Sequence, residues 1–279
     1  MRRSIVWGMI LVGLGFGPPS PLERLGRFAD PALVEVSGIV ASRKYPGIYW
    51  VHNDSGNPPA LFAVKLDGSV VRSYRVAAPN IDWEDLATDD RGHLYLGDIG
   101  NNENRLPIRV IHRLDEPDPT RPAPTEPLPL TASTFYKFPE NGRFDAESLI
   151  VEPGRALVIS KRFDGREAEI FAIPFDPPSG LLRPSLPVRL ASLPGCSEPA
   201  TGADLSSDGR HLSVVTTRAA RVYRRAGRDD WSLVATVPFD APGVEAICWS
   251  GRDLVLASED RSVYRITEKT WTTATEAAR

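Results

Sequence analysis

Acidic residues recur at one position of a sequence repeat, and they are the residues of this chain best suited to chemistry. Glu84, Glu147 and Glu245 each open a short apolar segment, and a serine or an alanine holds the same place in two further copies. We call these five the hub positions: Ser37, Glu84, Glu147, Ala203 and Glu245. Carboxylates that converge cannot all remain ionised without a counter-charge. The series therefore predicts a cation site.

The ligand types indicate which cation to expect. Oxygen ligands without cysteine or histidine favour a hard ion, and a wide ring suits Ca²⁺, which takes 6 to 8 oxygens, better than Mg²⁺. Asp204, one residue past Ala203, supplies a carboxylate for the fourth copy. A single glutamate at a strand start can instead serve only to bind loop amides, but three at one repeat position favour function. We predict Ca²⁺ bound by Ser37, Glu84, Glu147, Asp204 and Glu245.

Two loops and two basic residues are predicted to surround this site. Asp54-Ser-Gly-Asn57 and Asp98-Ile-Gly-Asn101 share a D-x-G-N pattern, while Lys161 and Arg218 follow strands of later copies. Basic side chains near a cation can hold an anion whose oxygen the metal polarises. We therefore predict catalytic roles for Asp54, Asp98, Lys161 and Arg218. D-x-G-N is also ordinary turn chemistry, so a purely structural role is the alternative.

The repeat predicts the fold that gathers these residues. Five copies at roughly 40 to 60 residue spacing, each with short strands separated by polar turns, are typical of propeller blades. We predict an all-β, five-bladed β-propeller with four-stranded blades, whose innermost strands carry the hub positions toward the central axis. Residues 22–29 are predicted to form an outer strand of the last blade, which closes the ring and removes exposed edges. Residues 269–274 are a candidate final strand.

Composition is consistent with one exported domain. The chain has 279 residues, 42% apolar residues, 26 prolines and a net charge of −3, which argues against a general nucleic-acid binder. Residues 22–279 are predicted to be a single propeller.

Residues 1–21 combine two arginines, a short apolar run and a Gly/Pro stop, which is typical of an export signal, with an uncleaved membrane anchor as the alternative. Cys196 and Cys248 are either a disulfide pair or two buried thiols.

The hub positions also carry a family resemblance. The series Ser37, Glu84, Glu147, Ala203, Glu245 resembles the Ser/Glu/Glu/Ser/Glu ring that holds the central Ca²⁺ of calcium-activated nucleotidases, the apyrase-type five-bladed propellers, and Asn53-Asp-Ser-Gly56 resembles a loop of that family. The chain as a whole is similar to secreted propellers described as esterase-like phytase domains. The resemblance implies calcium ligation by Ser37, Glu84, Glu147 and Glu245. Ala203 departs from the family serine, so Asp204, a backbone carbonyl or water must serve there.

These observations lead to one functional hypothesis and one competitor. The first is a secreted or periplasmic, calcium-binding hydrolase of phosphate-bearing or other anionic esters, acting as a monomer. The second is a non-catalytic module in which Ca²⁺ is structural and the face binds a glycan or a protein. A deep pocket containing Asp54, Asp98 and Lys161 would favour catalysis, whereas exposed aromatic residues such as Trp83 would favour binding.

Overall fold

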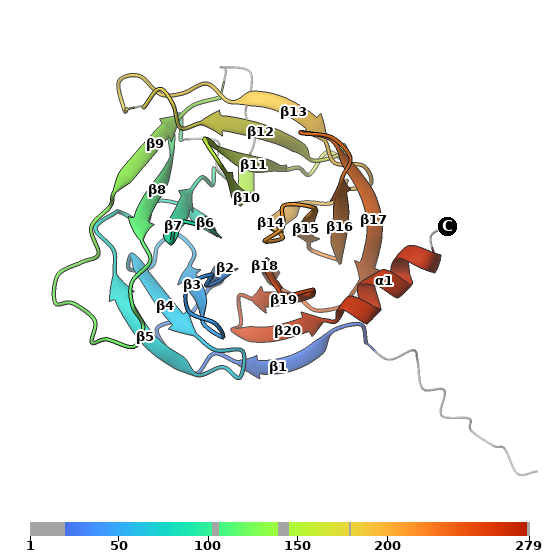
Figure 1. The fold of residues 1–279 in the computed structure, drawn as a ribbon, viewed down its shortest axis with the longest axis horizontal. Helices are drawn as coiled ribbons and strands as arrows, with labels where there is room; N and C mark the ends of the chain where they lie inside the picture. The colour runs from blue at the N-terminus through green and yellow to red at the C-terminus, as the bar shows by residue number, and fades with distance from the viewer. Residues whose placement is uncertain (1–19, 102–105, 139–144, 179, 278–279) are drawn as a thin grey trace, which may run out of the picture.

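The computed structural model describes residues 20–101, 106–138, 145–178 and 180–277. In these residues, twenty strands form five four-stranded antiparallel sheets arranged as a ring (Figure 1). The predicted five-bladed β-propeller is therefore confirmed. The predicted export segment, residues 1–21, lies almost wholly outside the described residues. No helix in the described part of the chain has the length and apolarity needed to cross a membrane.

Four blades are continuous in sequence, and each runs from an inner to an outer strand. Blade 1 contains β2 (Val36–Ala41), β3 (Tyr49–Asn53), β4 (Ala60–Val64) and β5 (Val70–Arg75). Blade 2 contains β6 (Trp83–Thr88), β7 (His93–Asp98), β8 (Arg109–Asp115) and β9 (Ala132–Tyr136). Blade 3 contains β10 (Asp145–Glu152), β11 (Arg155–Lys161), β12 (Glu169–Pro174) and β13 (Val188–Ser192). Blade 4 contains β14 (Ala200–Leu205), β15 (His211–Thr216), β16 (Ala219–Arg225) and β17 (Trp231–Pro238).

The fifth blade joins the two ends of the described chain. It combines β18 (Val244–Ser250), β19 (Asp253–Ser258) and β20 (Ser262–Ile266) with the N-terminal strand β1 (Glu23–Arg27), which pairs antiparallel with β20. Beyond this strand, the Ala29 N–H donates to Gly68 O at 2.9 Å, in the β4–β5 turn of blade 1. The N-terminal strand thus closes the ring as predicted, and it covers the outer edge of β20.

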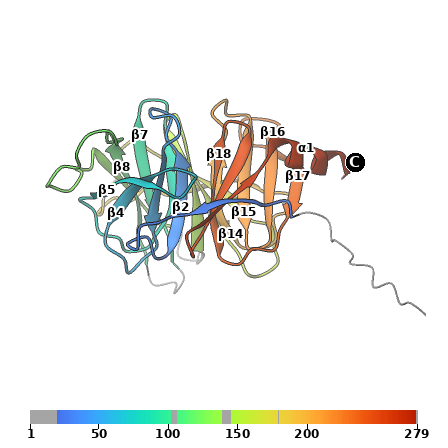
Figure 2. The same cartoon turned by 90° about the horizontal axis from the view of Figure 1, so that it is seen from below.

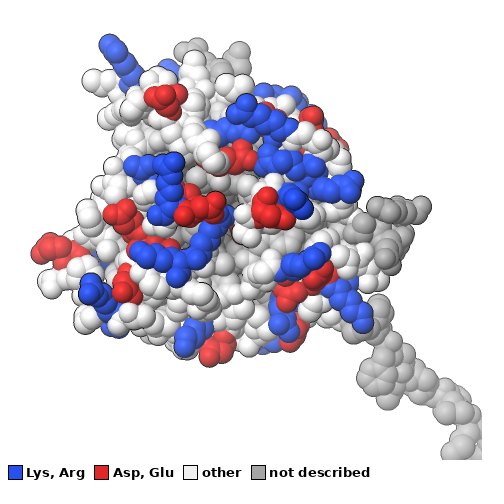
Figure 3. Space-filling view, viewed as in Figure 1, with Lys and Arg blue, Asp and Glu red and all other residues white. Residues whose placement is uncertain are grey.

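Strand direction gives the molecule two chemically different faces. The inner strands β2, β6, β10, β14 and β18 all begin on one face, which we call the hub face, and their second strands end there. The tight turns between first and second strands, such as Asp89–Gly92, lie on the opposite turn face; both faces are seen edge-on in Figure 2. On the turn face, basic and acidic side chains alternate (Figure 3) and pair with one another, as Arg155 does with Glu152 at 2.7 Å.

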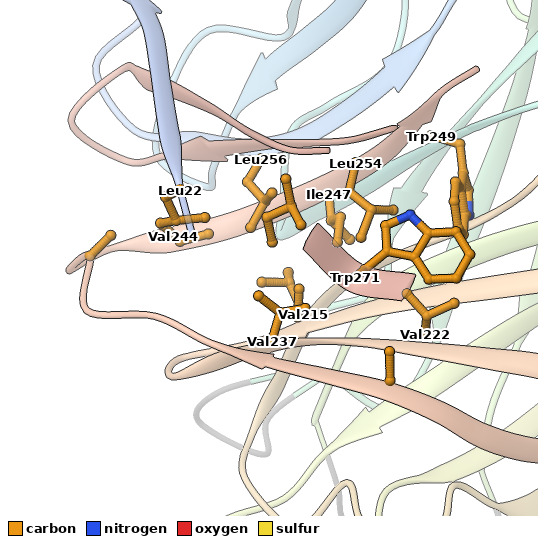
Figure 4. Packing of buried hydrophobic residues seen from close by; sticks show 14 residues of the cluster. Leu22, Val215, Val222, Val237, Val244, Ile247, Trp249, Leu254, Leu256 and Trp271 are labelled. Atoms are coloured by element: carbon orange, nitrogen blue, oxygen red, sulfur yellow. The ribbon is translucent and has the colours of Figure 1, made fainter. Parts of the chain in front are cut away.

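The core consists of apolar side chains packed between adjacent blades, because each sheet buries both of its faces. Between blades 4 and 5, Val222, Ile247 and Leu254 form such a cluster (Figure 4). Cys196 and Cys248 are buried free thiols in two different clusters, so the two-thiol alternative holds.

The C-terminal segment differs from the expected final strand. Residues Glu268–Ala277 form a helix, α1, whose Trp271 packs into the cluster between blades 4 and 5 (Figure 4). The Thr267 hydroxyl accepts from the Thr270 N–H at 3.2 Å, which is the geometry of a helix N-cap, and Glu268 adds a negative charge in the first turn. The candidate strand over residues 269–274 is therefore wrong, because this cap and the burial of Trp271 favour a helix.

Candidate metal centre at the hub

Every inner strand contains a β-bulge close to its start, and in four of the five strands the bulged residue is the predicted hub position. In β6, Trp83 pairs with Asp98 and Asp85 with Gly97, which leaves Glu84 without a partner on β7. A bulge leaves one residue outside the ladder and re-aims its side chain. The other four inner strands skip one residue in the same way, so the five bulged residues are Ser37, Glu84, Glu147, Thr201 and Glu245.

This register corrects the fourth hub position. The residue that β14 skips is Thr201, two positions before Ala203, whereas Ala203 itself pairs with Val214. The sequence prediction placed Ala203 at this position, and the error of two residues preserves the alternation of side chains along the strand. Thr201 is 1% exposed, and its hydroxyl has no hydrogen-bond partner within the described residues. A hydroxyl therefore stands where the resemblance expects a serine.

Asp204 does not join the other acidic residues. Its Oδ2 accepts from the Trp249 N–H at 2.8 Å, and its side chain lines a cavity of about 170 Å³ with Arg43 and Thr88. This cavity is formed by the ends of the inner strands at the turn face. Burial raises the pKa of Asp204 to about 7. The structure thus places this carboxylate at the other mouth of the central channel from the hub.

On the hub face, five carboxylates form two overlapping groups. One ligand oxygen each from Asp54, Asp82 and Glu84 lie within 4.8 Å of one another, and the same holds for Glu84, Asp145 and Glu147. Three of these residues were predicted at the site, Glu84 and Glu147 as ligands and Asp54 as a catalytic residue. Asp82 and Asp145 were missed. Each lies two residues before a hub glutamate, so the repeated D-x-E pattern was the signal that would have found them.

Several oxygens of this cluster are buried without a partner. Glu84 and Glu147 are 1% and 2% exposed and Asp145 is 7% exposed. Within the described residues, Glu84 Oε1, Glu147 Oε2 and Asp145 Oδ2 have no hydrogen-bond partner. An unsatisfied buried acceptor costs about 1–3 kcal/mol, and more when charged. The cluster therefore has capacity for a ligand that accepts oxygen lone pairs.

The pKa values show how unfavourable this charge density is. Burial, and then the neighbouring Glu147, raises the pKa of Glu84 well above its usual value. Burial also raises the pKa of Asp82 to about 6, and that of Glu147 to about 8 despite its partner Lys161. A carboxylic acid whose pKa is raised in this way holds its proton until a positive charge replaces it. The cluster should therefore release protons when a cation binds.

Glu245 and Ser37 flank the cluster. Ser37 Oγ donates to the backbone oxygen of Glu84 at 2.8 Å and lies 3.4 Å from Glu84 Oε2, so this hydroxyl joins blades 1 and 2 at the hub. Glu245 is partly exposed, and burial followed by its neighbour Glu259 raises its pKa to about 7. Lys161 and Asp54 also act on Glu245 electrostatically, which places it beside the cluster rather than within either group.

Lys161 and Arg109 bring positive charge to the site. Lys161 Nζ forms an ion pair with Glu147 Oε1 and lies 5.8 Å from the centre of the Phe163 ring. Burial lowers the pKa of Lys161, but the attraction of the Glu147 carboxylate has the larger effect, so the pKa of the lysine is raised. Arg109, which sequence reasoning missed, is 3% exposed and interacts electrostatically with Asp145 and Asp82. Arg218, by contrast, is exposed beyond the end of β15, outside both groups of carboxylates.

The predicted catalytic residue Asp98 has a positioning role in this structure. Its Oδ1 accepts from the Asp82 N–H at 2.8 Å. The loop that follows Asp98 also forms hydrogen bonds to residues of the acidic cluster. The Gly100 N–H donates to Asp82 O, and the Asn101 N–H donates to Asp145 Oδ1 at 2.6 Å. A Cβ at Gly100 would overlap the Glu84 and Asp82 carboxylates. The D-x-G-N loop of blade 2 therefore holds the acidic cluster in place.

His52 and Trp83 lie beneath the site as packed residues. His52 is fully buried, and burial lowers its pKa to about 4, so it is neutral at physiological pH. Its ring packs edge-on against Trp83 with 5.7 Å between ring centres. Trp83 is also fully buried and its indole N–H donates to Pro79 O at 2.8 Å. Neither residue offers a surface to a ligand.

Comparison with known proteins gives distant structural similarity only. No protein-family model and no curated protein matches the sequence. Hydrazine synthase of Kuenenia stuttgartiensis aligns with a TM-score of 0.45 at 12% identity, over 81% of this chain and 70% of that chain. A catalytically inactive virginiamycin B lyase from Staphylococcus aureus, solved with quinupristin, aligns with a TM-score of 0.43 at 13% identity, over 86% of this chain and 68% of that chain. The predicted similarity to nucleotidases and phytase-domain propellers stays a prediction.

Proposed function

We propose that this protein is an exported, calcium-binding β-propeller that hydrolyses phosphate-bearing or other anionic esters. The observation that carries the proposal is the set of buried carboxylate oxygens at the hub that have no partner among the described residues. The proposal includes export through residues 1–21, action as a monomer, and a small anionic molecule or glycan as the ligand.

The residues present fit a calcium ion. Glu84, Asp145 and Glu147 offer oxygens within 4.8 Å of one another, a spacing that one ion with Ca–O distances of about 2.3–2.6 Å can span. Ser37 and Thr201 add neutral oxygens at equivalent bulges, and Glu245 adds a carboxylate beside them. No cysteine or histidine belongs to either carboxylate group. This donor set favours a hard cation over zinc or copper.

The basic and half-exposed residues suggest how an ester would be held. When bound, the cation would polarise a phosphoryl or carbonyl oxygen of the substrate. Lys161 would steady the anionic group from the blade 3 side. Asp54 is partly exposed at the edge of the cluster, and burial raises its pKa, which suits acceptance of a proton from an attacking water.

A second candidate function has one observation in its favour. Phe163 is 75% exposed beside Lys161 at the hub face, as expected of a site that stacks a sugar or a protein side chain. In this alternative the cation is structural and the face only binds. Burial of Trp83 removes the aromatic surface that the sequence had offered for this role, so hydrolysis is the stronger proposal.

Hydrolysis of a substrate panel tests the proposal. Purified protein is incubated with nucleotides, phytate and aryl esters, with Ca²⁺ or with EDTA. We expect turnover of at least one anionic ester that EDTA abolishes, and that Glu84→Gln lowers at least a hundredfold. Asp89→Asn, a carboxylate on the turn face, is the matched control and should retain activity. Calcium binding without turnover on any substrate would overturn the hydrolase and favour the binding module.

A further inference from the structure

We propose that the hub holds two divalent cations side by side, bridged by the Glu84 carboxylate, and not one central ion. The inner ion would be the one proposed above, at Glu84, Asp145 and Glu147. The second, outer ion would lie at Asp54, Asp82 and Glu84. This inference rests on the proposed cation site and adds to it a second metal and a shared ligand.

The grouping of the oxygens supports two positions. Glu84 is the one residue common to the two carboxylate groups, whereas Asp54 and Asp82 do not share a group with Asp145 or Glu147. A single ion with Ca–O distances of about 2.3–2.6 Å keeps all its ligands within about 5 Å of one another. Two ions about 3.5–4 Å apart, a common arrangement in hydrolytic sites, need a ligand between them. Glu84 occupies that place.

The state of the Glu84 side chain fits a bridging role. It is 1% exposed, and its two oxygens have different surroundings. Oε2 lies 3.4 Å from Ser37 Oγ. Oε1 has no partner within the described residues. Both Oε1 and the Asp82 carboxylate lie next to Gly100. Gly100 leaves open the space that any larger residue would fill between these two carboxylates. The outer group is therefore built around an unpartnered, buried oxygen.

Charge balance also favours two ions. The five carboxylates of the two groups and Glu245 beside them carry six negative charges when ionised, whereas Lys161 and Arg109 supply two positive charges. One divalent cation would leave this set with two excess negative charges in a largely buried environment. Two divalent cations would neutralise it. Burying an excess of negative charge costs free energy. The second ion removes the part of this cost that remains after the first ion binds.

The two positions differ in exposure, which predicts a difference in affinity. The inner group consists of three buried residues, whereas Asp54 and Asp82 of the outer group are partly exposed. Water can compete more readily at the outer position. We expect the outer ion to exchange faster and to bind more weakly, and a substrate oxygen to reach it first.

Metal counting on the full chain, with Mn²⁺ as the probe, tests this inference. Mn²⁺ uses the same oxygen ligands as Ca²⁺, and two Mn²⁺ ions joined by a carboxylate give an exchange-coupled electron paramagnetic resonance spectrum. We expect two bound ions per chain and a coupled spectrum. Asp82→Asn and Asp54→Asn should each leave one ion with an uncoupled spectrum, and so should Asp145→Asn. Asp89→Asn should keep two coupled ions.

The outcomes separate this inference from the proposed function. One ion per chain in the unaltered protein would overturn the second site while leaving the calcium-dependent hydrolase intact. Two ions with an uncoupled spectrum would overturn the bridge by Glu84. No bound ion would overturn both proposals. Circular dichroism of each variant identifies those that fail to fold, and the unaltered protein decides the stoichiometry without them.

Discussion

At the scale of single residues, the hub combines glutamates at the start of the inner strands with aspartates two residues before two of them. Glu84, Glu147 and Glu245 were predictable because each opens an apolar strand at the same place in a repeat. Asp82 and Asp145 were not, because each precedes the apolar run by which the strand is recognised in the sequence. Thr201 was not predicted, because a bulge leaves no mark in a pattern of alternating residues.

Lys161 is predicted to compete with divalent cations for Glu147. Its ammonium is paired with the Glu147 carboxylate, which the cation site would also use. Replacing this lysine with the uncharged Lys161→Met should raise the affinity for Ca²⁺ about three- to tenfold, corresponding to about 0.6–1.4 kcal/mol. Isothermal titration calorimetry measures the change, with Arg218→Met on the same face as the control. A weaker affinity in Lys161→Met would contradict the competition.

Asp204 is predicted to make stability depend on pH. Its pKa is raised from about 4 in the unfolded chain to about 7 in the folded protein, so the folded state binds more protons between these values. The contribution of this group to the free energy of unfolding is therefore largest below pH 4 and is lost as the pH rises to 7.

The variant Asp204→Asn cannot ionise and keeps an oxygen for the Trp249 N–H. At pH 8 it should be more stable than the unaltered protein by about 2 kcal/mol, a figure reduced for the partial exposure of Asp204. The difference should vanish at pH 4. Urea unfolding in EDTA at both pH values measures it, and an equal difference at both would show that titration of Asp204 is not the cause.

At the scale of elements, the strands were predictable from the sequence, whereas the C-terminal helix and the hydrogen bonds between blades were not. Alternating apolar residues and Gly-containing turns define the strands of each blade, whereas the C-terminal helix depends on the Thr267 cap and on a pocket for Trp271 that forms only in the folded ring. Asp85 provides a similar example. It is fully buried on β6, and its Oδ2 accepts from Leu149 N–H at 2.8 Å and from Ala203 N–H at 3.4 Å.

Asp85 is predicted to hold three inner strands together. Its carboxylate joins β6 to β10 and β14, so Asp85→Ala would leave buried N–H groups on two other blades without an acceptor. We expect a loss of about 2–4 kcal/mol in the free energy of unfolding. Asp85→Asn, which retains an acceptor, should lose less, and the exposed Glu126→Ala should change stability by under about 0.5 kcal/mol. Equal stability of Asp85→Ala and the unaltered protein would remove this role.

At the scale of the whole molecule, stability depends on how the ring is closed. β1 joins the last blade to the first, and the contact is tight: Gly68 has φ +93°, and a Cβ there would overlap the backbone of Arg27. The closing strand was predictable because residues 22–29 precede the first hub position as outer strands precede the others. Its close approach to the β4–β5 turn was not, because the sequence shows a glycine only as a turn residue.

Gly68→Ala is predicted to weaken this closure. Gly154 has φ +83°, but a Cβ added there would meet no atom within 4 Å, so Gly154→Ala suffers the same backbone strain without the overlap. We expect a loss of about 1 kcal/mol for Gly154→Ala and at least about 2 kcal/mol more for Gly68→Ala. Calorimetric melting temperatures compare the two. Similar values for both variants would show that the approach of β1 to blade 1 contributes little.

The five bulges have a consequence for how such a protein can change. Because a bulged residue has no partner in its sheet, its side chain can be exchanged without cost to the pairing of the strands. The ring thus has five equivalent bulge positions around one axis, which carry two hydroxyl and three carboxylate side chains in this protein. Single substitutions such as Thr201→Asp can therefore change the set of oxygen donors at the hub while the scaffold stays the same.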